Sequence, residues 1–407
     1  MKDNFNSLLG IFPNDEVKTV PAVETPVVPT IQESVSTAGT PAESQIITPE
    51  LVVTNVSTEP ISIPNNVEKV TGSVVNFKKR IAINGFGRIG RIAFRIMMDD
   101  PDVEVVAINS GSGPEQQAYL LKYDSTFKTY DKDVSFDSEN IIVDGKKIKA
   151  LSEKDPTKLP WKELNVDVVL ECTGKFLSVE DSMAHINSGA KKVLISAPGK
   201  GDMKTIVYNV NDNILDGTEK IVSAASCTTN CLAPVLKVIN DNFGISKGYM
   251  TTIHAYTNDQ SNLDVSHKKG INSRRGRASA MNIVPTSTGA ATAIGLVIPE
   301  LEGKMHGGAM RVPVIDGSLV DLVLELNKNV TIEEINDVFQ NNQNETIKYT
   351  EDPIVSSDIV GTSCGGMVDG QLTNVLEVDG KQLVKIVAWY DNEMGYSYQM
   401  VRTAKKM

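Results

Sequence analysis

A glycine-rich turn between a short apolar strand and a helix limits the folds that this chain can adopt. Residues 81–83 are apolar, residues 84–90 contain the pattern Gly-x-Gly-x-x-Gly, and residues 91–99 have helical spacing. Pro101 ends that helix, and residues 103–108 form the next apolar run. This strand, turn, helix, strand unit is the setting in which the glycine pattern binds a dinucleotide. The sequence therefore predicts an α/β fold with a Rossmann-type domain.

Each glycine of the pattern has its own physical task. Gly85 permits the tight turn, Gly87 lets the backbone approach a pyrophosphate, and Gly90 lets the helix pack close to the strand. The N–H groups of the helix N-terminus then face the anion. A turn that serves packing alone is the alternative, and the flanking strand and helix favour cofactor binding over it.

The end of the second strand lacks the carboxylate that usually binds the adenosine ribose. An acidic residue about 20 positions beyond the glycines normally binds the 2′-hydroxyl and repels a 2′-phosphate. Residues 109–113 instead read Asn-Ser-Gly-Ser-Gly. Because the like-charge repulsion is missing, the segment favours NADP as cofactor.

Composition limits the partners and the compartment. A formal net charge of −11 over 407 residues argues against nucleic acid or an anionic membrane as the main partner. Four irregularly spaced cysteines without an N-terminal apolar signal predict a reduced, cytoplasmic protein. No stretch approaches the roughly 18 apolar residues of a membrane span.

Residues 1–79 differ from the rest of the chain. They contain eight of the 18 prolines, no Arg, Tyr or Trp, and nine acidic residues against five lysines. We predict a disordered acidic extension, with a linker over about residues 13–75, because such a segment buries too little apolar surface to offset its ordering entropy. Phe5, Leu8, Leu9 and Phe12 have helical spacing. Two interpretations stay open: a docking helix over 3–12 for a protein partner, or chance spacing in a disordered tip.

A cysteine and a histidine in two further motifs suggest covalent chemistry. Cys227 lies among hydroxyl-bearing residues in the segment 226–231, where the first turns of a helix would lower its pKa. His254, in the segment 252–257, would pair with the thiolate and act as acid and base. Buried packing residues are the alternative for both, and for Cys231, one helical turn on, packing is the preferred interpretation. Cys and His spacing fits no zinc site, so we expect no metal.

Over about residues 80–407, the chain resembles the phosphorylating glyceraldehyde-3-phosphate dehydrogenases. The segments around Cys227 and His254, together with residues 307–313 and 389–397, stand in the order of that family. The resemblance implies a dinucleotide-binding domain over 80–226 and 389–407, and an α+β catalytic domain with a mostly antiparallel sheet over 227–388. It also implies a homotetramer that converts glyceraldehyde 3-phosphate and inorganic phosphate reversibly to 1,3-bisphosphoglycerate.

The resemblance assigns roles to single residues. Cys227 would be the nucleophile, His254 the acid and base, and Asn392 the residue that holds the nicotinamide carboxamide. The implied cofactor-binding residues are Gly85, Gly87, Arg88, Ile89, Gly90, Ser110, Lys154, Thr173, Ser196, Ser266 and Asn392. The implied binders of the substrate phosphate are Thr257 and Arg311, and those of inorganic phosphate are Ser226, Thr228, Thr288 and Gly289.

Two departures from NAD-specific members of the family favour NADP over NAD. Ser110 stands where an aspartate marks NAD use, and Ser266 resembles the photosynthetic, NADP-using members. Lys154 adds a cation near the adenosine end. The basic loop 259–281 is interpreted as a guide for phosphate-bearing ligands at a subunit contact, with a solvated loop or a nucleic-acid patch as alternatives.

Three other functions remain open from the sequence. Erythrose-4-phosphate dehydrogenase shares the fold and the cysteine chemistry, and kinetics with both sugar phosphates would separate the two. A non-enzymatic scaffold or binding protein would predict a damaged site. A surface adhesin would need export, for which the sequence carries no signal.

Overall fold

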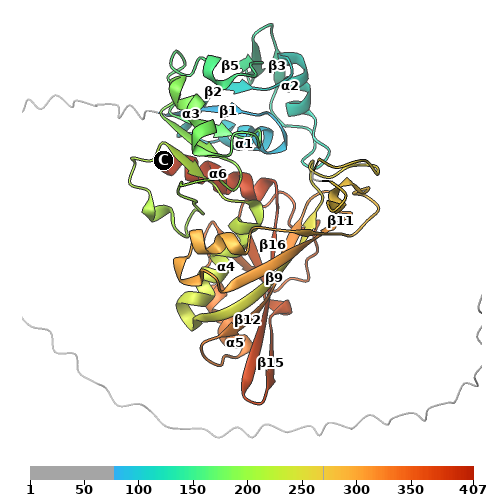
Figure 1. Ribbon diagram of the computed structural model, residues 1–407. Helices are drawn as coiled ribbons and strands as arrows, with labels where there is room; N and C mark the ends of the chain where they lie inside the picture. The colour runs from blue at the N-terminus through green and yellow to red at the C-terminus, as the bar shows by residue number, and fades with distance from the viewer. Residues whose placement is uncertain (1–77, 269) are drawn as a thin grey trace, which may run out of the picture. The chain divides into compact units, whose positions relative to one another are not determined.

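The computed structural model describes residues 78–268 and 270–407, and in this part of the chain it contains two eight-stranded sheets (Figure 1). Residues 1–77, which hold almost all of the predicted extension and its docking helix 3–12, lie outside the described residues, as does Lys269 of the basic loop.

The first sheet has the order expected of a dinucleotide-binding domain. In spatial order its strands are β3 (Val134–Phe136), β4 (Asn140–Val143), β5 (Lys146–Leu151), β2 (Val103–Asn109), β1 (Lys79–Asn84), β6 (Val168–Glu171), β7 (Lys192–Ile195) and β8 (Ile221–Ser223). Six neighbouring strands are parallel to one another: β5, β2, β1, β6, β7 and β8. Strands β3 and β4, at the edge, pair in the antiparallel direction. Numbered among themselves, the parallel strands follow the order 3-2-1-4-5-6. The direction of winding reverses between β1 and β6, and ligands bind at the carboxyl ends of such a pair.

Helices α1 (Arg88–Met98), α2 (Pro114–Lys122), α3 (Val179–Asn187) and α6 (Met394–Lys406) accompany this sheet (Figure 1). Helix α1 begins three residues before the predicted start because Gly87 is already its N-cap. It buries Ile92, Phe94 and Met97, and Ile96 is half-buried. Helix α6 packs against α1, so the end of the chain returns to this domain.

The second sheet is mostly antiparallel, as predicted. Its strands in spatial order are β10 (Val284–Ser287), β11 (Met305–Val312), β9 (Ile245–Ala255), β12 (Ser318–Leu326), β16 (Lys381–Tyr390), β14 (Gly366–Asp369) and β13 (Ile347–Thr350), and β15 (Asn374–Val378) pairs with β16. The β11–β9 and β14–β13 pairs are parallel, and the other five pairs are antiparallel. The predicted fold class, a Rossmann-type domain with an α+β catalytic domain, is confirmed for the described residues.

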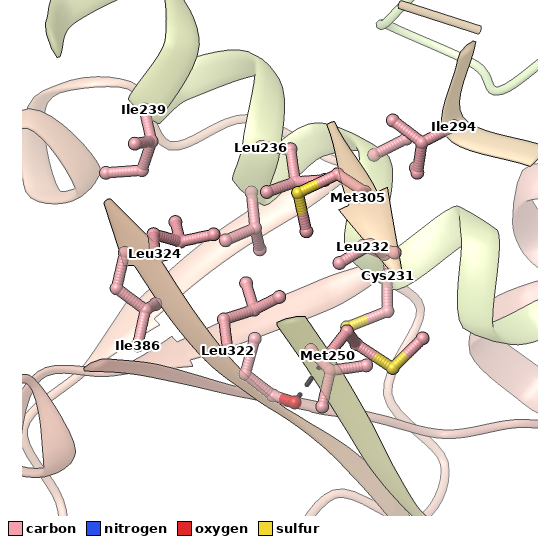
Figure 2. Packing of buried hydrophobic residues seen from close by; sticks show 14 of the residues in the cluster. Cys231, Leu232, Leu236, Ile239, Met250, Ile294, Met305, Leu322, Leu324 and Ile386 are labelled. Atoms are coloured by element: carbon pink, nitrogen blue, oxygen red, sulfur yellow. Dashed lines mark hydrogen bonds between the residues drawn. The ribbon is translucent and has the colours of Figure 1, made fainter. Parts of the chain in front are cut away.

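Helices α4 (Cys227–Phe243) and α5 (Ile332–Asn341) cover the core of the second sheet. Figure 2 shows Leu232, Leu236 and Ile239 of α4 among sheet residues such as Leu322 and Ile386. Each fully buried Leu or Ile side chain stabilises the fold by about 1.5–3 kcal/mol. Cys231 belongs to this cluster and is fully buried, in agreement with the packing role predicted for it. The helix that begins at Cys227 is therefore firmly held in the core.

The two ends of the described chain lie side by side. The Lys79 ammonium group donates hydrogen bonds to the carbonyl oxygens of Ala404 (3.2 Å) and Lys405 (2.8 Å). The last turn of α6 thus lies against the first residues of β1.

Among the described helices, none is long and apolar enough to cross a bilayer.

Candidate active site

The glycines at the carboxyl end of β1 form a close-packed turn. Gly85 has φ +102°, and a Cβ on it would lie 2.6 Å from the carbonyl carbon of Cys172. A Cβ on Gly90 would lie 2.1 Å from the carbonyl oxygen of Gly85. A Cβ on Gly87, in contrast, would have no described atom within 4 Å. Two glycines therefore permit packing, and the third leaves space for a ligand.

This open side of Gly87 faces a cavity of about 510 Å³. The residues that line the cavity include Gly85, Gly87, Ser110, Lys154 and Thr173 of the predicted cofactor set. Within the described chain, no side chain caps the N-terminus of α1, so its first N–H groups are available to an anion. The glycine cradle and this helix end together fit the pyrophosphate of a dinucleotide.

A side-chain clamp shapes the end of the cavity near Ser110. Asn109 donates to the carbonyl of Glu153 (2.9 Å) and accepts a hydrogen bond from the N–H of the same residue (2.9 Å). It also donates to Asn84 Oδ1 (2.7 Å), which fixes its amide orientation. The clamp holds the exposed Lys154 beside Ser110, whose hydroxyl lies 3.2 Å from that of Ser112. The sequence analysis missed Asn109, although its position at the end of β2 was visible.

The remaining predicted cofactor residues lie elsewhere. The guanidinium of Arg88 forms ion pairs with Glu393 and Asp124, so its side chain contacts the protein and does not line the cavity. Ile89 packs on the core, and the Ser196 N–H donates to the carbonyl of Glu171 (3.0 Å). Ser266 is exposed in the basic loop and does not line the cavity. Asn392 is buried, and its Oδ1 accepts a hydrogen bond from Ser318.

Cys227 is the first residue of α4. The Ser226 hydroxyl caps the helix by accepting from the N–H of Thr229 (3.1 Å). Ala225, just before the cap, has φ +58°, a left-handed conformation that costs about 1–2 kcal/mol for a non-glycine residue. The buried Asn230 amide holds this turn by donating to the carbonyls of Ala224 (2.9 Å) and Ser226 (3.0 Å). The thiol is therefore displayed on a constrained turn at a helix N-terminus.

The backbone determines which nitrogen of His254 faces the thiol. Nδ1 lies 2.7 Å from the carbonyl oxygen of Ala255, which only accepts, so Nδ1 carries the proton in the neutral ring. Nε2 is then an acceptor, and it lies 3.3 Å from Sγ of Cys227. His254 is consequently placed to take the thiol proton on Nε2.

Burial acts against the charged form of each group. Burial raises the pKa of the Cys227 thiol above its usual value, although the nearby Arg311 and the N–H and hydroxyl of Thr228 act in the opposite direction. Burial, followed by the charge of Arg311, lowers the pKa of His254 to about 3. Taken singly, these shifts oppose the low thiol pKa that the sequence analysis expected. That expectation rested on the helix N-terminus, which lowers a thiol pKa. Desolvation raises the pKa of Cys227 by more than the nearby groups lower it.

Ionisation costs less when the two groups ionise together than when either ionises alone. Opposite charges 3.3 Å apart attract by about 5 kcal/mol at an effective dielectric constant of about 20. That attraction corresponds to between three and four pKa units, roughly. Transfer of the proton from Sγ to Nε2 creates both charges at once and so recovers this energy.

Replacing His254 with Asn is expected to move alkylation of Cys227 to higher pH. Without the imidazole, the thiol must ionise alone, against the burial that raises its pKa above the usual value of 9.0. Iodoacetamide should therefore modify the variant appreciably only above about pH 9, and the native protein already near neutral pH. Peptide mapping of the labelled Cys227 measures this. Equal pH profiles for the two proteins would exclude the pair.

A second cavity, of about 990 Å³, adjoins the Cys–His pair. It is lined by His254 and by five of the predicted phosphate ligands: Ser226, Thr228, Thr288, Gly289 and Arg311. The sixth, Thr257, is outside the lining but accepts a hydrogen bond from Arg311 Nη1 (2.9 Å). Arg311 Nε is buried and has no hydrogen-bond partner among the described residues. An unpaired buried donor on a cation is suited to bind an anion.

The same cavity contains a residue to which the sequence analysis gave no separate role. Arg275, from the basic loop, lines the cavity, donates to Thr286 Oγ1 (3.1 Å) and forms an ion pair with Asp259. The charge run was visible in the sequence, but which of its members turns inward depends on long-range contacts. In residues 78–268 and 270–407, no group of three or more His, Cys, Asp or Glu residues is arranged to hold a metal.

Comparison with known proteins agrees with this site. Residues 79–179 match the glyceraldehyde 3-phosphate dehydrogenase NAD binding domain, and residues 226–392 match the C-terminal domain of the same enzyme. Glyceraldehyde-3-phosphate dehydrogenase from Clostridium pasteurianum is 56% identical over 324 residues, which cover 80% of this chain and 97% of that protein. The protein of the same name from Streptococcus pyogenes is 55% identical over 325 residues, 80% of this chain and 96% of its own length. The chain therefore belongs to the glyceraldehyde-3-phosphate dehydrogenase family.

Proposed function

We propose that this protein oxidises and phosphorylates glyceraldehyde 3-phosphate reversibly to 1,3-bisphosphoglycerate with NADP as its preferred cofactor. Membership of the family makes the chain an NAD(P)-dependent, phosphorylating aldehyde dehydrogenase. The observation that carries the substrate assignment is the Cys227–His254 contact of 3.3 Å beside a cavity lined by anion-binding residues.

The chemistry follows from the positions of these side chains. Sγ of Cys227 adds to the aldehyde carbon as its proton moves to Nε2 of His254, and the proton then neutralises the alkoxide of the hemithioacetal. When bound, the nicotinamide cofactor supplies the acceptor for the hydride that leaves this carbon. His254 regains the hydroxyl proton as the C=O bond forms, and a thioester remains on Sγ. An oxygen of inorganic phosphate displaces the thiolate and completes the acyl phosphate.

Two groups of residues are suited to hold the two phosphates. Arg311, with its unpaired Nε and its contact to Thr257, is assigned to the phosphate of the substrate. The hydroxyl and backbone donors of Ser226, Thr228, Thr288 and Gly289 are assigned to the attacking phosphate. Omission of phosphate should then stop steady-state turnover after a single acylation of the enzyme.

Steady-state kinetics test the function. We expect turnover of glyceraldehyde 3-phosphate to depend on phosphate and to exceed turnover of erythrose 4-phosphate. A preference for erythrose 4-phosphate, or no oxidation of either aldehyde, would contradict the proposal. The intact nucleophile, base and anion ligands favour an enzyme over a scaffold.

The assignment of NADP rests on the adenosine end of the first cavity. Ser110 and Gly111 line it where a carboxylate would repel a 2′-phosphate, and Lys154 is held nearby. Glu153 also lines the cavity, but its carboxylate accepts from the N–H of Asp155 (2.9 Å). We propose that Ser266 reaches the cofactor of a neighbouring subunit, since within one chain it does not line the cavity.

Replacing Ser110 with Asp is expected to lower kcat/KM for NADP by at least about tenfold and to leave NAD turnover intact or improved. The new carboxylate would repel the 2′-phosphate and accept from the ribose hydroxyls of NAD. Kinetics with both cofactors measure the change, and Ser110→Asn serves as the uncharged control. A native kcat/KM for NAD more than tenfold above that for NADP would already refute the preference.

We propose a homotetramer in the cytoplasm, with domains that span 80–226 plus 389–407 and 227–388, and light scattering on the pure protein tests the tetramer. Residues 1–12 are proposed to dock a protein partner. Their deletion should remove a co-purifying protein and leave turnover unchanged, and an unchanged set of partners would end this idea.

A further inference from the structure

Two short segments meet at the edge between the second sheet and α6. Ser318, the first residue of β12, pairs with Tyr390, the last residue of β16. Because the strands are antiparallel, the residues before Ser318 lie beside those after Tyr390. Asp316 therefore lies near Asp391 and Asn392, and all three side chains are at most 4% exposed.

The carboxyl groups of Asp316 and Asp391 lie within hydrogen-bonding reach of each other. Asp391 accepts three backbone hydrogen bonds, from Gly361 (2.7 Å), Glu393 (2.8 Å) and Met394 (2.6 Å), which suits its ionised form. Asp316 Oδ1 accepts from the N–H of Gly317 (2.8 Å).

Oδ2 of Asp316 is buried, and no hydrogen-bond partner for it exists among the described residues as long as both carboxyl groups are ionised. A buried oxygen in that state is costly. A proton on Oδ2 removes the cost, because the hydroxyl then donates to the ionised Asp391. Burial, and then the negative charges of Asp391 and Glu393, raise the pKa of Asp316 to about 9. Glu393 is itself bound by Arg88, which also binds Asp124.

Ser318 contacts Asn392, the residue that follows Asp391. Its hydroxyl accepts from the N–H of Ala255 (3.0 Å) and donates to Oδ1 of Asn392 (2.6 Å). Since Oδ1 is occupied, the amide Nδ2 of Asn392 is the side that remains for a ligand. Ser318 thereby selects one of the two amide orientations.

We infer that Asp316 and Ser318 are positioning residues that hold Asn392 in the one orientation from which its Nδ2 donates to the nicotinamide carboxamide. This inference rests on the proposed cofactor role of Asn392. The carboxyl pair of Asp316 and Asp391 fixes the backbone of the Asp391–Asn392 turn, and Ser318 fixes the amide. Loss of the Asp316 proton puts two negative charges together in a dry site and loosens the turn.

The direction in which stability changes with pH follows from the raised pKa of Asp316. Asp316 binds its proton more tightly in the folded protein than in the unfolded chain, where its pKa is near the usual 3.8. The contribution to stability is therefore complete below about pH 4 and is lost as pH rises through about 9. Cofactor affinity should weaken over the upper part of this range.

Calorimetric titration with NADP from about pH 7 to about pH 10 tests the inference. We expect the native Kd to weaken by roughly tenfold, the worth of one hydrogen bond to a charged group. Asp316→Asn carries a permanent N–H donor toward Asp391, so its Kd should change by less than about twofold. Asp379→Asn, the same substitution at an exposed turn, should follow the native curve.

A second variant tests the amide orientation. Ser318→Ala frees the Asn392 amide to rotate, so a deuterated aldehyde should deliver its label to both faces of the nicotinamide instead of one. Parallel pH curves for the native protein and Asp316→Asn, or single-face transfer by Ser318→Ala, would overturn the inference. The calorimetric test needs the cofactor alone, so it can fail or succeed whether or not glyceraldehyde 3-phosphate is the substrate.

Discussion

Replacing Cys227 with Ser is expected to lower aldehyde oxidation by about 10⁴-fold or more, with NADP affinity unchanged within about twofold. A serine hydroxyl at the same place has a much higher pKa than a thiol and is a far weaker nucleophile. The helix N-terminus and the His254 contact of 3.3 Å activate a thiol but cannot ionise an alcohol near neutral pH. The cofactor cavity does not include Cys227 in its lining, so binding should persist.

Single-turnover kinetics and calorimetry measure these two properties separately. Cys231→Ser is the matched control, because it makes the same exchange one helical turn along α4. Cys231 Sγ lies 3.9 Å from the carbonyl oxygens of Ala388 and Trp389, which can accept from a serine hydroxyl. The control should keep its turnover. Native-like oxidation by Cys227→Ser would mean that another group attacks the aldehyde.

Replacing Arg311 with Lys is expected to lower kcat/KM for glyceraldehyde 3-phosphate by roughly 10²- to 10³-fold. Lys cannot supply the planar fork whose Nε is buried and unpaired in the described part of the chain. The bonds to the Ala255 carbonyl (3.1 Å) and to Thr257 (2.9 Å) also use that geometry. Among the interactions that favour the Cys227 thiolate, the charge of Arg311 is the largest, so the thiolate should also lose stabilisation if the ammonium lies farther away.

Two measurements separate these effects on binding and on the thiol. KM for the aldehyde should rise, and the pH profile of Cys227 alkylation should shift upward by less than in His254→Asn. Arg277→Lys is the control, because it makes the same exchange at an exposed arginine of the basic loop 259–281, one that pairs with Asp264 (2.9 Å). If the control loses as much activity as Arg311→Lys, the loss does not come from the contact of Arg311 with the anion.

Local patterns were sufficient to predict the first strand–turn–helix–strand unit of the first sheet. The glycine turn, its flanking strand and the spacing of α1 involve residues within about one βαβ unit, and the structure has them in the parallel order that such units adopt. The second sheet was inferred only through the resemblance to a family. Its strand order joins β9, β11 and β12 across long loops, which no local pattern encodes.

In the site too, local motifs predicted some features, and others depend on long-range packing. Cys227 and His254 were visible as residue types in motifs, and they lie in contact. The pKa values could not be predicted, because desolvation depends on everything packed around the pair. Asp316 was missed for the same reason: a carboxylate beside a glycine suggests a turn, and only the fold buries it against Asp391.

The bonds from Lys79 to the carbonyls of Ala404 and Lys405 have a practical consequence for protein engineering. Since the first strand and the last helix touch, a short peptide joining residue 407 to residue 79 would permit circular permutation, with new termini opened in a surface turn such as that at Asp379 and Gly380. The same adjacency means that a cargo fused after Met407 would emerge beside Lys79, where β1 begins.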